Sequence, residues 1–385
     1  MRIIHIADIH WRGLSRHDEY TEAFSDFFSQ CRKLKPDIIY VGGDIVHSKT
    51  QGISPELIDR LAWWITEMSK ICPVHMILGN HDGLILNKDR QDAITPIVQA
   101  LNNKNVFLYK KSGVYPTGFP GFNWCVFSCF DEEGWQSVRP VDGEINIALF
   151  HGAVWGSKTD IDWEIEGEVT VDLFDTFDFS LLGDIHKKQY LNTKKTIAYC
   201  GSTIQQNYGE DIEKGFLVWD IQSKDIYSSK FYQVKNRFPF VTIDWDNSVE
   251  KVLQKAREYP EGSRFRIRSK SMLTQAVSQE LSSRIRSELK ATEVVFKNDN
   301  QLSSSGSNIF TKGTDSKLDL RDLSSQQSLF RKYFNNSGLD SEEVEDLSLL
   351  VDKYFSAATS EEDALRNAKW QIENIRFDNL FSYGS

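Results

Sequence analysis

Cysteine is scarce in this sequence: only five occur among 385 residues, and no two of them form a CxxC pair. An odd number of scattered cysteines argues against a disulfide framework, and the missing pairs argue against a thiolate zinc site. We therefore expect reduced thiols, with Cys125 and Cys129 filling an apolar core.

Long apolar runs are also missing. The longest, such as residues 38–41, are strand-sized, whereas a helix that crosses a bilayer needs about 20 apolar residues. The carboxylate of Asp8 leaves no room for the apolar core of a secretory signal before charge appears. The sequence thus predicts no membrane segment and an intracellular, cytoplasmic protein, or one in the host cytoplasm or nucleus if the chain is viral.

A basic excess is absent as well, because the formal net charge is −10 at pH 7. Proteins that grip nucleic-acid phosphates usually carry a basic surplus, so any positive surface here must be local. One local surplus exists: residues 251–290 contain ten Lys or Arg and four Glu, a net charge of +6. Residues 337–365 carry nine acids and one base, so charge is segregated along the chain.

Short apolar runs alternate with amphipathic segments over residues 1–235, which predicts an α/β fold. Residues 18–35 and 54–70 have apolar side chains at helical spacing and lie between strand-like runs, an order typical of a parallel sheet covered by helices. Later strands have less helix between them, so we expect a second sheet packed on the first, flanked by helices. The expected strands are residues 3–7, 38–41, 74–78, 125–129, 145–150, 179–182, 196–199 and 216–219.

The rest of the chain changes character. Residues 236–300 combine three strand-like runs with one helical segment near 273–290, which predicts a small α+β capping module. Residues 301–315 are rich in Ser and Gly and read as a linker. Two amphipathic helices follow within residues 316–358, and they must bury their apolar stripes either on this chain or in a partner. The stripe residues are Leu329, Phe330, Tyr333, Phe334, Val344, Leu347, Leu350, Val351, Tyr354 and Phe355.

Polar residues gather where the expected strands end. The carboxyl ends of parallel strands share one edge of a sheet, where such folds bind ligands, so these side chains are expected to converge. Carboxylate, imidazole and amide oxygen together suit Mn²⁺, Mg²⁺ or Fe²⁺. Two ions about 3.5–4 Å apart need one bridging carboxylate, and Asp44 is the natural bridge. The residues are Asp8, His10, Asp44, His47, Asn80, His81, Asp82, His151, Asp184 and His186.

These motifs resemble the signature of the calcineurin-like metallophosphoesterases, in order and spacing, over roughly residues 1–235. Within that superfamily, the segment Gly43 to Ser48 is similar to the GDxxHS segment of the SbcD-type, or Mre-type, DNA repair nucleases, whereas the protein phosphatases continue with Asp-Arg. Residues 199–216 also resemble the late "GS…KGF" segment of that nuclease branch. The resemblance implies a two-sheet sandwich with a capping domain at 236–300 and an ATPase-binding helical segment at 316–358.

The resemblance also implies roles for individual residues. It makes one metal site from Asp8, His10, Asp44 and His186, and the other from Asp44, Asn80, His151 and Asp184. His81 would be the general acid or phosphate-stabilising group, and His47 would assist it. The implied function is Mn²⁺-dependent hydrolysis of DNA phosphodiester bonds, exonucleolytic on duplex ends and endonucleolytic on single strands, by a homodimer.

One position departs from the nuclease pattern, because Asp184-x-His186 stands where His-x-His is usual. If Asp184 is a ligand, three carboxylates face two divalent ions, and the site should favour harder ions. If Asp184 points away, the second metal should be weakly held.

The C-terminal residues 370–385 are similar to the opening strand of SbcC-type, or Rad-type, ATPases. No GxxxxGK[ST] segment occurs in the chain, so it does not bind ATP by that route. We hypothesise that the chain is the nuclease part of a longer nuclease–ATPase fusion; an ordinary final strand is the alternative.

The function and the DNA contacts both have alternatives at this stage. Arg264, Arg266, Arg268 and Lys270 are candidates for DNA binding, or are the solvent face of an alternating strand. The enzyme is either a DNA nuclease working with an SbcC/Rad-type ATPase in break repair and recombination, or a phosphoesterase acting on a small phosphodiester or a phosphoprotein. A third reading, a scaffold with a decayed site, depends on Asp184 alone.

Overall fold

The structure is a computed structural model, and it describes residues 1–47, 53–87 and 90–299. By contacts the chain divides into Met1–Lys297 and Asn298–Ser385. The expected linker, the helix pair with its partner-binding residues and the strand at 370–385 lie outside the described residues, so they stay predictions.

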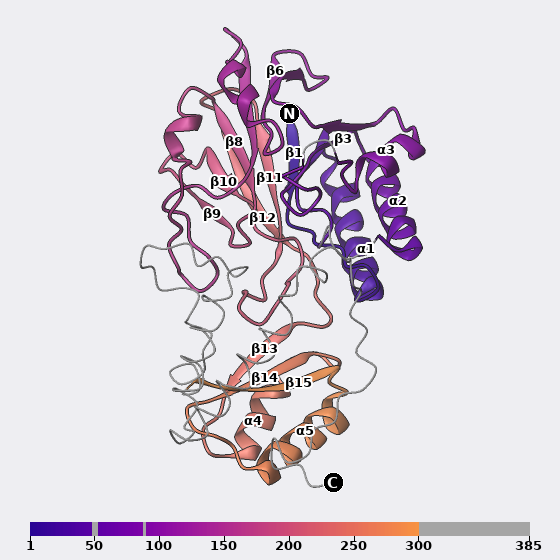
Figure 1. Ribbon diagram of the computed structural model, residues 1–385, viewed down its shortest axis with the longest axis vertical. Coiled ribbons are helices and arrows are strands. Elements are labelled where there is room, and N and C mark those ends of the chain that lie inside the picture. The colour runs from indigo at the N-terminus through magenta and orange to yellow at the C-terminus, as the bar shows by residue number, and fades with distance from the viewer. Residues whose placement is uncertain (48–52, 88–89, 300–385) are drawn as a thin grey trace, which may run out of the picture. The chain divides into compact units, whose positions relative to one another are not determined.

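The first sheet has six strands in the order β12-β11-β1-β2-β3-β4 (Figure 1). Strands β1 to β4 run parallel, while β11 and β12 are antiparallel to their neighbours. The near-continuous apolar sequences of β1, β2, β3 and β11 fit strands buried on both faces, whereas β4 and β12 at the two edges are partly exposed. The bounds are β1 Arg2–Ile6, β2 Ile38–Gly42, β3 Val74–Ile77, β4 Val106–Tyr109, β11 Gly215–Ile221 and β12 Tyr227–Gln233.

Three helices connect the parallel strands and lie together on one side of β1 and β3 (Figure 1). They are α1 His17–Leu34, α2 Pro55–Ser69 and α3 Thr95–Leu101. Ser54 caps α2 by accepting a hydrogen bond from the Leu57 amide at 3.2 Å, with Pro55 at the first helical position. Helix α1 ends at Leu34; the next residue, Lys35, has a left-handed conformation and directly precedes Pro36, which cannot continue a helix.

The second sheet also has six strands, in the order β5-β6-β7-β8-β10-β9. Strands β6, β7, β8 and β10 are parallel, and the edge strands β5 and β9 are antiparallel. Its outer face is covered by loops and by two short 3-10 helices, η1 Glu132–Ser137 and η2 Val171–Phe174. The strand bounds are β5 Gly113–Pro116, β6 Phe122–Phe127, β7 Ile145–His151, β8 Phe179–Gly183, β9 Gln189–Tyr190 and β10 Ile197–Tyr199.

Alternation along each strand divides the apolar side chains between two cores. On β2, Ile39 and Val41 face the helices, whereas Ile38 and Tyr40 belong to the core between the sheets. That inter-sheet core also contains Trp124 of β6 and other side chains of the second sheet, so the two sheets pack face to face. The two-sheet sandwich flanked by helices that the sequence predicts is confirmed.

Residues 236–299 form a third sheet with its own apolar core. Helices α4 and α5 lie together on one side of its three strands (Figure 1). The elements are β13 Phe240–Asp244, α4 Val249–Ala256, β14 Arg264–Ser269, α5 Gln275–Leu289 and β15 Glu293–Asn298. The sequence predicted the three strands and α5 but missed α4, whose eight residues make a short signal despite the Ser248 cap.

No helix within the described residues is long and apolar enough to cross a membrane. All five cysteines, each at a described position, are free and buried, and Cys125 and Cys129 are among the core residues, as the sequence predicts for these two.

Candidate metal centre

The polar residues singled out in the sequence do converge, but not on one edge of one sheet. Asp8 and Asp44 follow β1 and β2 in the first sheet, whereas His151 ends β7 and Asp184 follows β8 in the second. The expectation of a single shared edge is therefore wrong. The strand ends meet because the two parallel strand sets are stacked face to face, and each contributes ligands from its own carboxyl end.

Four of these residues have a left-handed backbone, with φ of 54° at Asp8, 52° at His10, 51° at Asp44 and 99° at Asp184. This conformation costs on the order of 1 kcal/mol or more for a residue with a side chain. It turns the chain sharply after each strand, so that the side chain faces the centre. Four of the eleven non-glycine residues with a positive φ in the described part of the chain therefore lie in this centre.

Two glycines allow the loops to approach closely. A Cβ atom on Gly79 would lie 2.3 Å from the amide nitrogen and Oδ1 of Asp44, and one on Gly43 would lie 2.5 Å from His151 Nδ1. Gly43 also has a φ of +91°. A larger residue at either position would push Asp44 and His151 apart.

Three overlapping groups of side chains could each hold a metal ion, since in each the ligand atoms lie within 4.8 Å of one another. They are Asp8, His10 and His186; His10, Asp44 and His81; and Asp8, Asp44 and His151. Asp44 and Asp8 each belong to two groups. The donor set of imidazole nitrogens and carboxylate oxygens fits divalent ions, and the shared carboxylates fit a pair of adjacent ions.

His151 is oriented as a ligand by the main chain. Its Nδ1 lies 2.6 Å from the carbonyl oxygen of Gly42, and because a carbonyl only accepts, Nδ1 carries the proton. In the neutral ring the lone pair is then on Nε2, which lies 3.3 Å from Asp44 Oδ1 and 3.7 Å from Asp184 Oδ1. Asp184 therefore points into the centre rather than away from it. Its amide nitrogen also donates to Asp8 Oδ1 at 3.0 Å.

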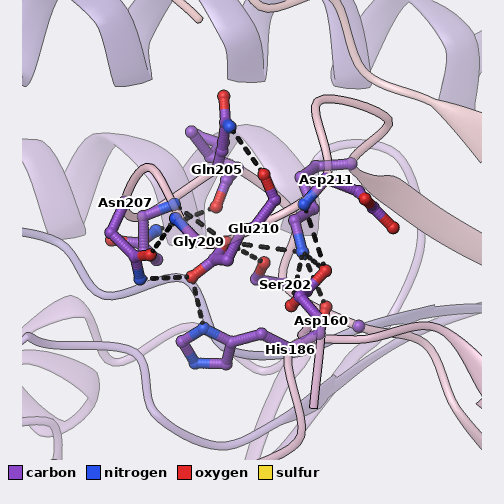
Figure 2. A network of polar contacts seen from close by, with 12 residues as sticks. Asp160, His186, Ser202, Gln205, Asn207, Gly209, Glu210 and Asp211 are labelled. Carbon is purple, nitrogen blue, oxygen red and sulfur yellow. Dashed lines mark hydrogen bonds and ion pairs between the residues drawn. The ribbon is translucent and has the colours of Figure 1, made fainter. Parts of the chain in front are cut away.

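His186 is oriented by a buried carboxylate that the sequence reasoning did not single out. Its Nδ1 lies 2.8 Å from Glu210 Oε1, which leaves Nε2 facing His10 Nε2 at 3.0 Å. Figure 2 shows the Glu210 side chain among Ser202, Asn207 and His186. Such a carboxylate–histidine pair fixes the ring of a metal-binding histidine and makes it more basic.

The remaining acceptor positions of Glu210 are also filled. Its Oε2 accepts from Ser202 Oγ at 3.2 Å and from the Gln206 amide at 2.9 Å, and its Oε1 accepts from Asn207 Nδ2 at 3.0 Å. Lys214 adds a charge contact at 3.4 Å. Glu210 occurs within the "GS…KGF" segment, but its distance of 24 residues from His186 offers no spacing rule that would have identified it.

His81 and His47 lie beside the same centre. The ring of His81 is 4.9 Å from that of His10, and its amide donates to Asp44 Oδ1 at 2.8 Å. Its Nδ1 lies 2.5 Å from the carbonyl oxygen of His47, so Nδ1 is the donor and Nε2 is left for other contacts. The ring of His47 is 5.6 Å from that of His10. Asn80 lies between Gly79 and His81 in the loop that contacts Asp44.

Asp82 is a structural member of this loop. It is fully buried, and its carboxylate accepts from the amides of Ile45, Val46 and Gly79 at 2.8–2.9 Å. Because the Asp82 carboxylate links the loop after β2 to the loop after β3, it fixes the position of Asp44 relative to His81. The sequence placed Asp82 in a motif but assigned it no role.

The electrostatics of the centre favour displacement of protons by a cation. Burial raises the pKa of Asp8 to about 7 and lowers that of His10 to about 3. At His186 burial acts to lower the pKa, but the hydrogen bond to Glu210 and the charge of Asp8 outweigh it and raise the pKa to about 9. Burial acts to raise the pKa of Asp44, but His151 holds it below its usual range.

The basic residues of β14 face partners within this chain. Arg264 bonds Glu19 of α1 at 2.7 Å, Arg266 donates to the carbonyl of Tyr208 at 2.9 Å, and Arg268 pairs with Asp244. Lys270 is exposed at the end of the strand. This arrangement agrees better with the face of an alternating strand than with a free row of phosphate ligands.

Comparison with known proteins finds a family similar to the N-terminal part of the chain. The calcineurin-like phosphoesterase family matches residues 1–188. Residues 1–188, slightly less than half of the chain, are thus similar to the calcineurin-like metallophosphoesterases. Members of this family use divalent metal ions, and the residues described above fit that requirement.

Two viral proteins are similar in sequence. An uncharacterized protein of Acanthamoeba polyphaga mimivirus is 32% identical over 414 residues, covering 99% of this chain and 29% of that protein. "Putative phosphoesterase 244L" of Invertebrate iridescent virus 6 is 26% identical over 232 residues, covering 56% of this chain and 75% of that protein. The chain thus spans less than a third of the mimivirus protein.

Among solved structures, a glutamine-dependent NAD+ synthetase from Acinetobacter baumannii in complex with ADP shares a TM-score of 0.30 and 10% identity, covering 92% of this chain and 72% of that chain. A likeness at this level carries no argument about fold or function.

Proposed function

We propose that this chain is a Mn²⁺-dependent DNA nuclease that acts on duplex ends as an exonuclease and on single strands as an endonuclease. The observation that carries the proposal is the position of His47, whose ring lies 5.6 Å from His10 and 6.3 Å from His81. His47 belongs to the GDxxHS segment that distinguishes the resemblance to the SbcD-type nucleases from the resemblance to phosphatases. The position of His47 beside the metal centre supports a role for this residue in the reaction.

In this proposal Asp8, His10, Asp44 and His186 hold one ion, and Asp44, Asn80, His151 and Asp184 hold the other. Bound divalent ions supply positive charge for the phosphate oxygens and lower the pKa of water. With Asp184 as a ligand, three carboxylates face the two ions, so Mn²⁺ or Mg²⁺ is preferred over softer ions. Full occupancy of both sites by Mn²⁺, with Asp184 in contact, in an anomalous-scattering experiment would support this ligand set; an unoccupied second site would contradict it.

His81 is proposed as the general acid. The carbonyl of His47 fixes its Nδ1–H at 2.5 Å, so a protonated His81 carries its second proton on Nε2. That proton can pass to the leaving sugar oxygen as the phosphodiester bond breaks. His47 assists both through this carbonyl, which orients the His81 ring, and through its own ring, which lies 5.6 Å from that of His10.

The third-sheet module contacts the segment that positions His186. Gln205 donates to the carbonyl of Phe240 at 2.9 Å, and Tyr208 donates to Glu293 at 2.6 Å. These contacts support a capping role for residues 236–300. DNA contact by Arg264, Arg266, Arg268 and Lys270 stays a prediction.

The test compares three substrates, each with Mn²⁺ and with EDTA: end-labelled duplex DNA, circular single-stranded DNA and bis-p-nitrophenyl phosphate. We expect Mn²⁺-dependent cleavage of all three. Cleavage of the small ester alone would favour a phosphoesterase for small diesters, and a parallel assay on a phosphoprotein would identify the other alternative. Cleavage of none would favour a non-catalytic scaffold.

We further propose that the chain acts inside the cell, as a homodimer, with an SbcC/Rad-type ATPase in DNA break repair, and that residues 370–385 begin a fused ATPase. The mimivirus relative is compatible with a longer parent chain, because the match covers 29% of its length. Reading the parent gene tests this point: a stop codon directly after Ser385 contradicts the fusion. Light scattering of the purified chain tests the dimer.

A further inference from the structure

A small hairpin, residues 157–165, lies beside the metal centre and exposes two large apolar side chains. Ile161 is 72% exposed and Trp163 is 70% exposed, although both are costly to leave in water. The hairpin is ordered by main-chain bonds, among them the Thr159 amide to the Trp163 carbonyl at 2.9 Å and the Ile165 amide to the Ser157 carbonyl at 2.8 Å. The apolar side chains are thus held outward by a defined backbone.

The hairpin is anchored to the machinery that orients His186. Lys214 donates to Asp160 Oδ1 at 3.0 Å and to the carbonyl oxygen of His186 at 2.8 Å. The side chains of Lys214 and Asp160 are only 5% and 6% exposed. Figure 2 shows Asp160 close to His186 and Glu210. This buried ion pair fixes the position of the hairpin relative to the metal centre.

A cavity of about 400 Å³ lies between the hairpin and the centre. Its volume falls within the range of about 300–1,000 Å³ typical of ligand pockets. Ile161 and Trp163 form its apolar wall, and Asp184, His186 and Glu210 are among its other lining residues. A phosphate held at the metal centre would therefore have the cavity directly beside it.

The charges around the cavity suit a neutral group. Asp160 and Glu210 are paired with Lys214 and His186, and Asp184 contributes a further carboxyl. No cation among these lining residues is left to attract a second phosphate, whereas a flat aromatic face such as that of Trp163 stacks with any nucleobase. The ligand class that fits is a planar uncharged base attached to the phosphate.

We propose that Trp163 and Ile161 form a subsite for the nucleobase next to the scissile phosphate, with the base stacked on the indole. This inference rests on the proposed nuclease function and gives it a substrate contact. Stacking is tolerant of base identity, so the subsite would hold a strand in place without reading its sequence.

The test uses Trp163→Ala and Trp163→Phe in the full chain with Mn²⁺. Trp163→Ala should raise KM for a short single-stranded oligonucleotide about tenfold and leave hydrolysis of an abasic oligonucleotide of the same length unchanged, because the abasic strand has no base to stack. Trp163→Phe should recover most of the affinity. Trp155→Ala is the matched control, since Trp155 is 54% exposed on the same loop but is not among the residues that line the cavity.

A second measurement follows indole fluorescence during titration with the dinucleotide pTpT. We expect quenching in the wild type and in Trp155→Ala, and its loss in Trp163→Ala. Equal KM values for Trp163→Ala and Trp155→Ala would overturn the subsite and leave a protein-docking role for the apolar side chains. An equal loss on both substrates would also overturn it, because Trp163 would then support the metal centre. If the wild type cleaves bis-p-nitrophenyl phosphate but no DNA, the nuclease proposal itself fails.

Discussion

The metal centre and the β14 arginine row both contain charged side chains at regular places in the sequence, but the partners of those side chains differ. At the centre, the ligand atoms of Asp8, Asp44 and His151 lie within 4.8 Å of one another, an arrangement that can hold a cation. On β14, Arg264 and Arg268 each meet a carboxylate of this chain. The charges of the centre converge because two sets of parallel strands are stacked with their carboxyl ends together, whereas the charges along β14 contact the elements that pack against that strand.

Among substitutions that test this contrast, His81→Ala at the metal centre is expected to have the largest effect, which is on the rate of DNA cleavage. Loss of a general acid typically costs about 10²–10⁴-fold in rate, so DNA cleavage should become barely detectable. Both metals should remain, which elemental analysis can measure. His17→Ala is the control, because the His17 ring bonds the carbonyl of Arg12 instead. If metal is lost along with activity, His81 is a ligand, an outcome compatible with its place near His10 and Asp44.

The second prediction concerns pH. In the metal-free centre Asp8 takes up a proton below about pH 7 and His186 below about pH 9. A divalent ion must displace those protons, so metal affinity should rise with pH between 6 and 8, by roughly tenfold per pH unit for each proton released. Titration calorimetry with Mn²⁺ in two buffers of different ionisation enthalpy would count the protons. Affinity independent of pH would show that these two groups do not bind the metal.

Glu210→Gln tests the carboxylate behind His186. Removing such a partner typically lowers metal affinity or activity by about 10–100-fold. Without the negative charge the pKa of His186 should fall, so the steep part of the pH dependence of metal binding should shift downward. Asp211→Asn is the matched control, since it removes a neighbouring exposed carboxylate that does not contact His186. Equal metal affinities in the two variants would contradict a positioning role for Glu210.

The smallest effects are expected on β14. Arg264→Ala should lower the free energy of unfolding by about 1–3 kcal/mol, because it removes charged hydrogen bonds to Glu19 while Arg16 still pairs with that carboxylate. Arg268→Ala should cost less than about 1 kcal/mol, because its side chain is 43% exposed. Urea denaturation measures both. A larger loss of unfolding free energy in Arg268→Ala than in Arg264→Ala would contradict this prediction.

The candidate site was largely predictable from the sequence. Each ligand candidate from Asp8 to His186 follows an apolar run, and the order of these runs alone indicated parallel strands. Glu210 and Trp163 could not be found in this way, because neither stands at a strand end. Their roles arise from contacts between the loop after β10, the hairpin at 157–165 and His186, which are distant in sequence.

The fold likewise has features that the sequence determined and features that only the tertiary structure decided. The sequence alone determined the residue types available as metal ligands and the approximate strand positions, because apolar periodicity and residue type are local properties. Tertiary structure decided that β7 and β8 belong to a different sheet from β1 and β2, and hence that the ligands meet across two sheets. It also decided that the arginines of β14 bind this chain, since a side chain's partner depends on packing between elements and not on its own spacing.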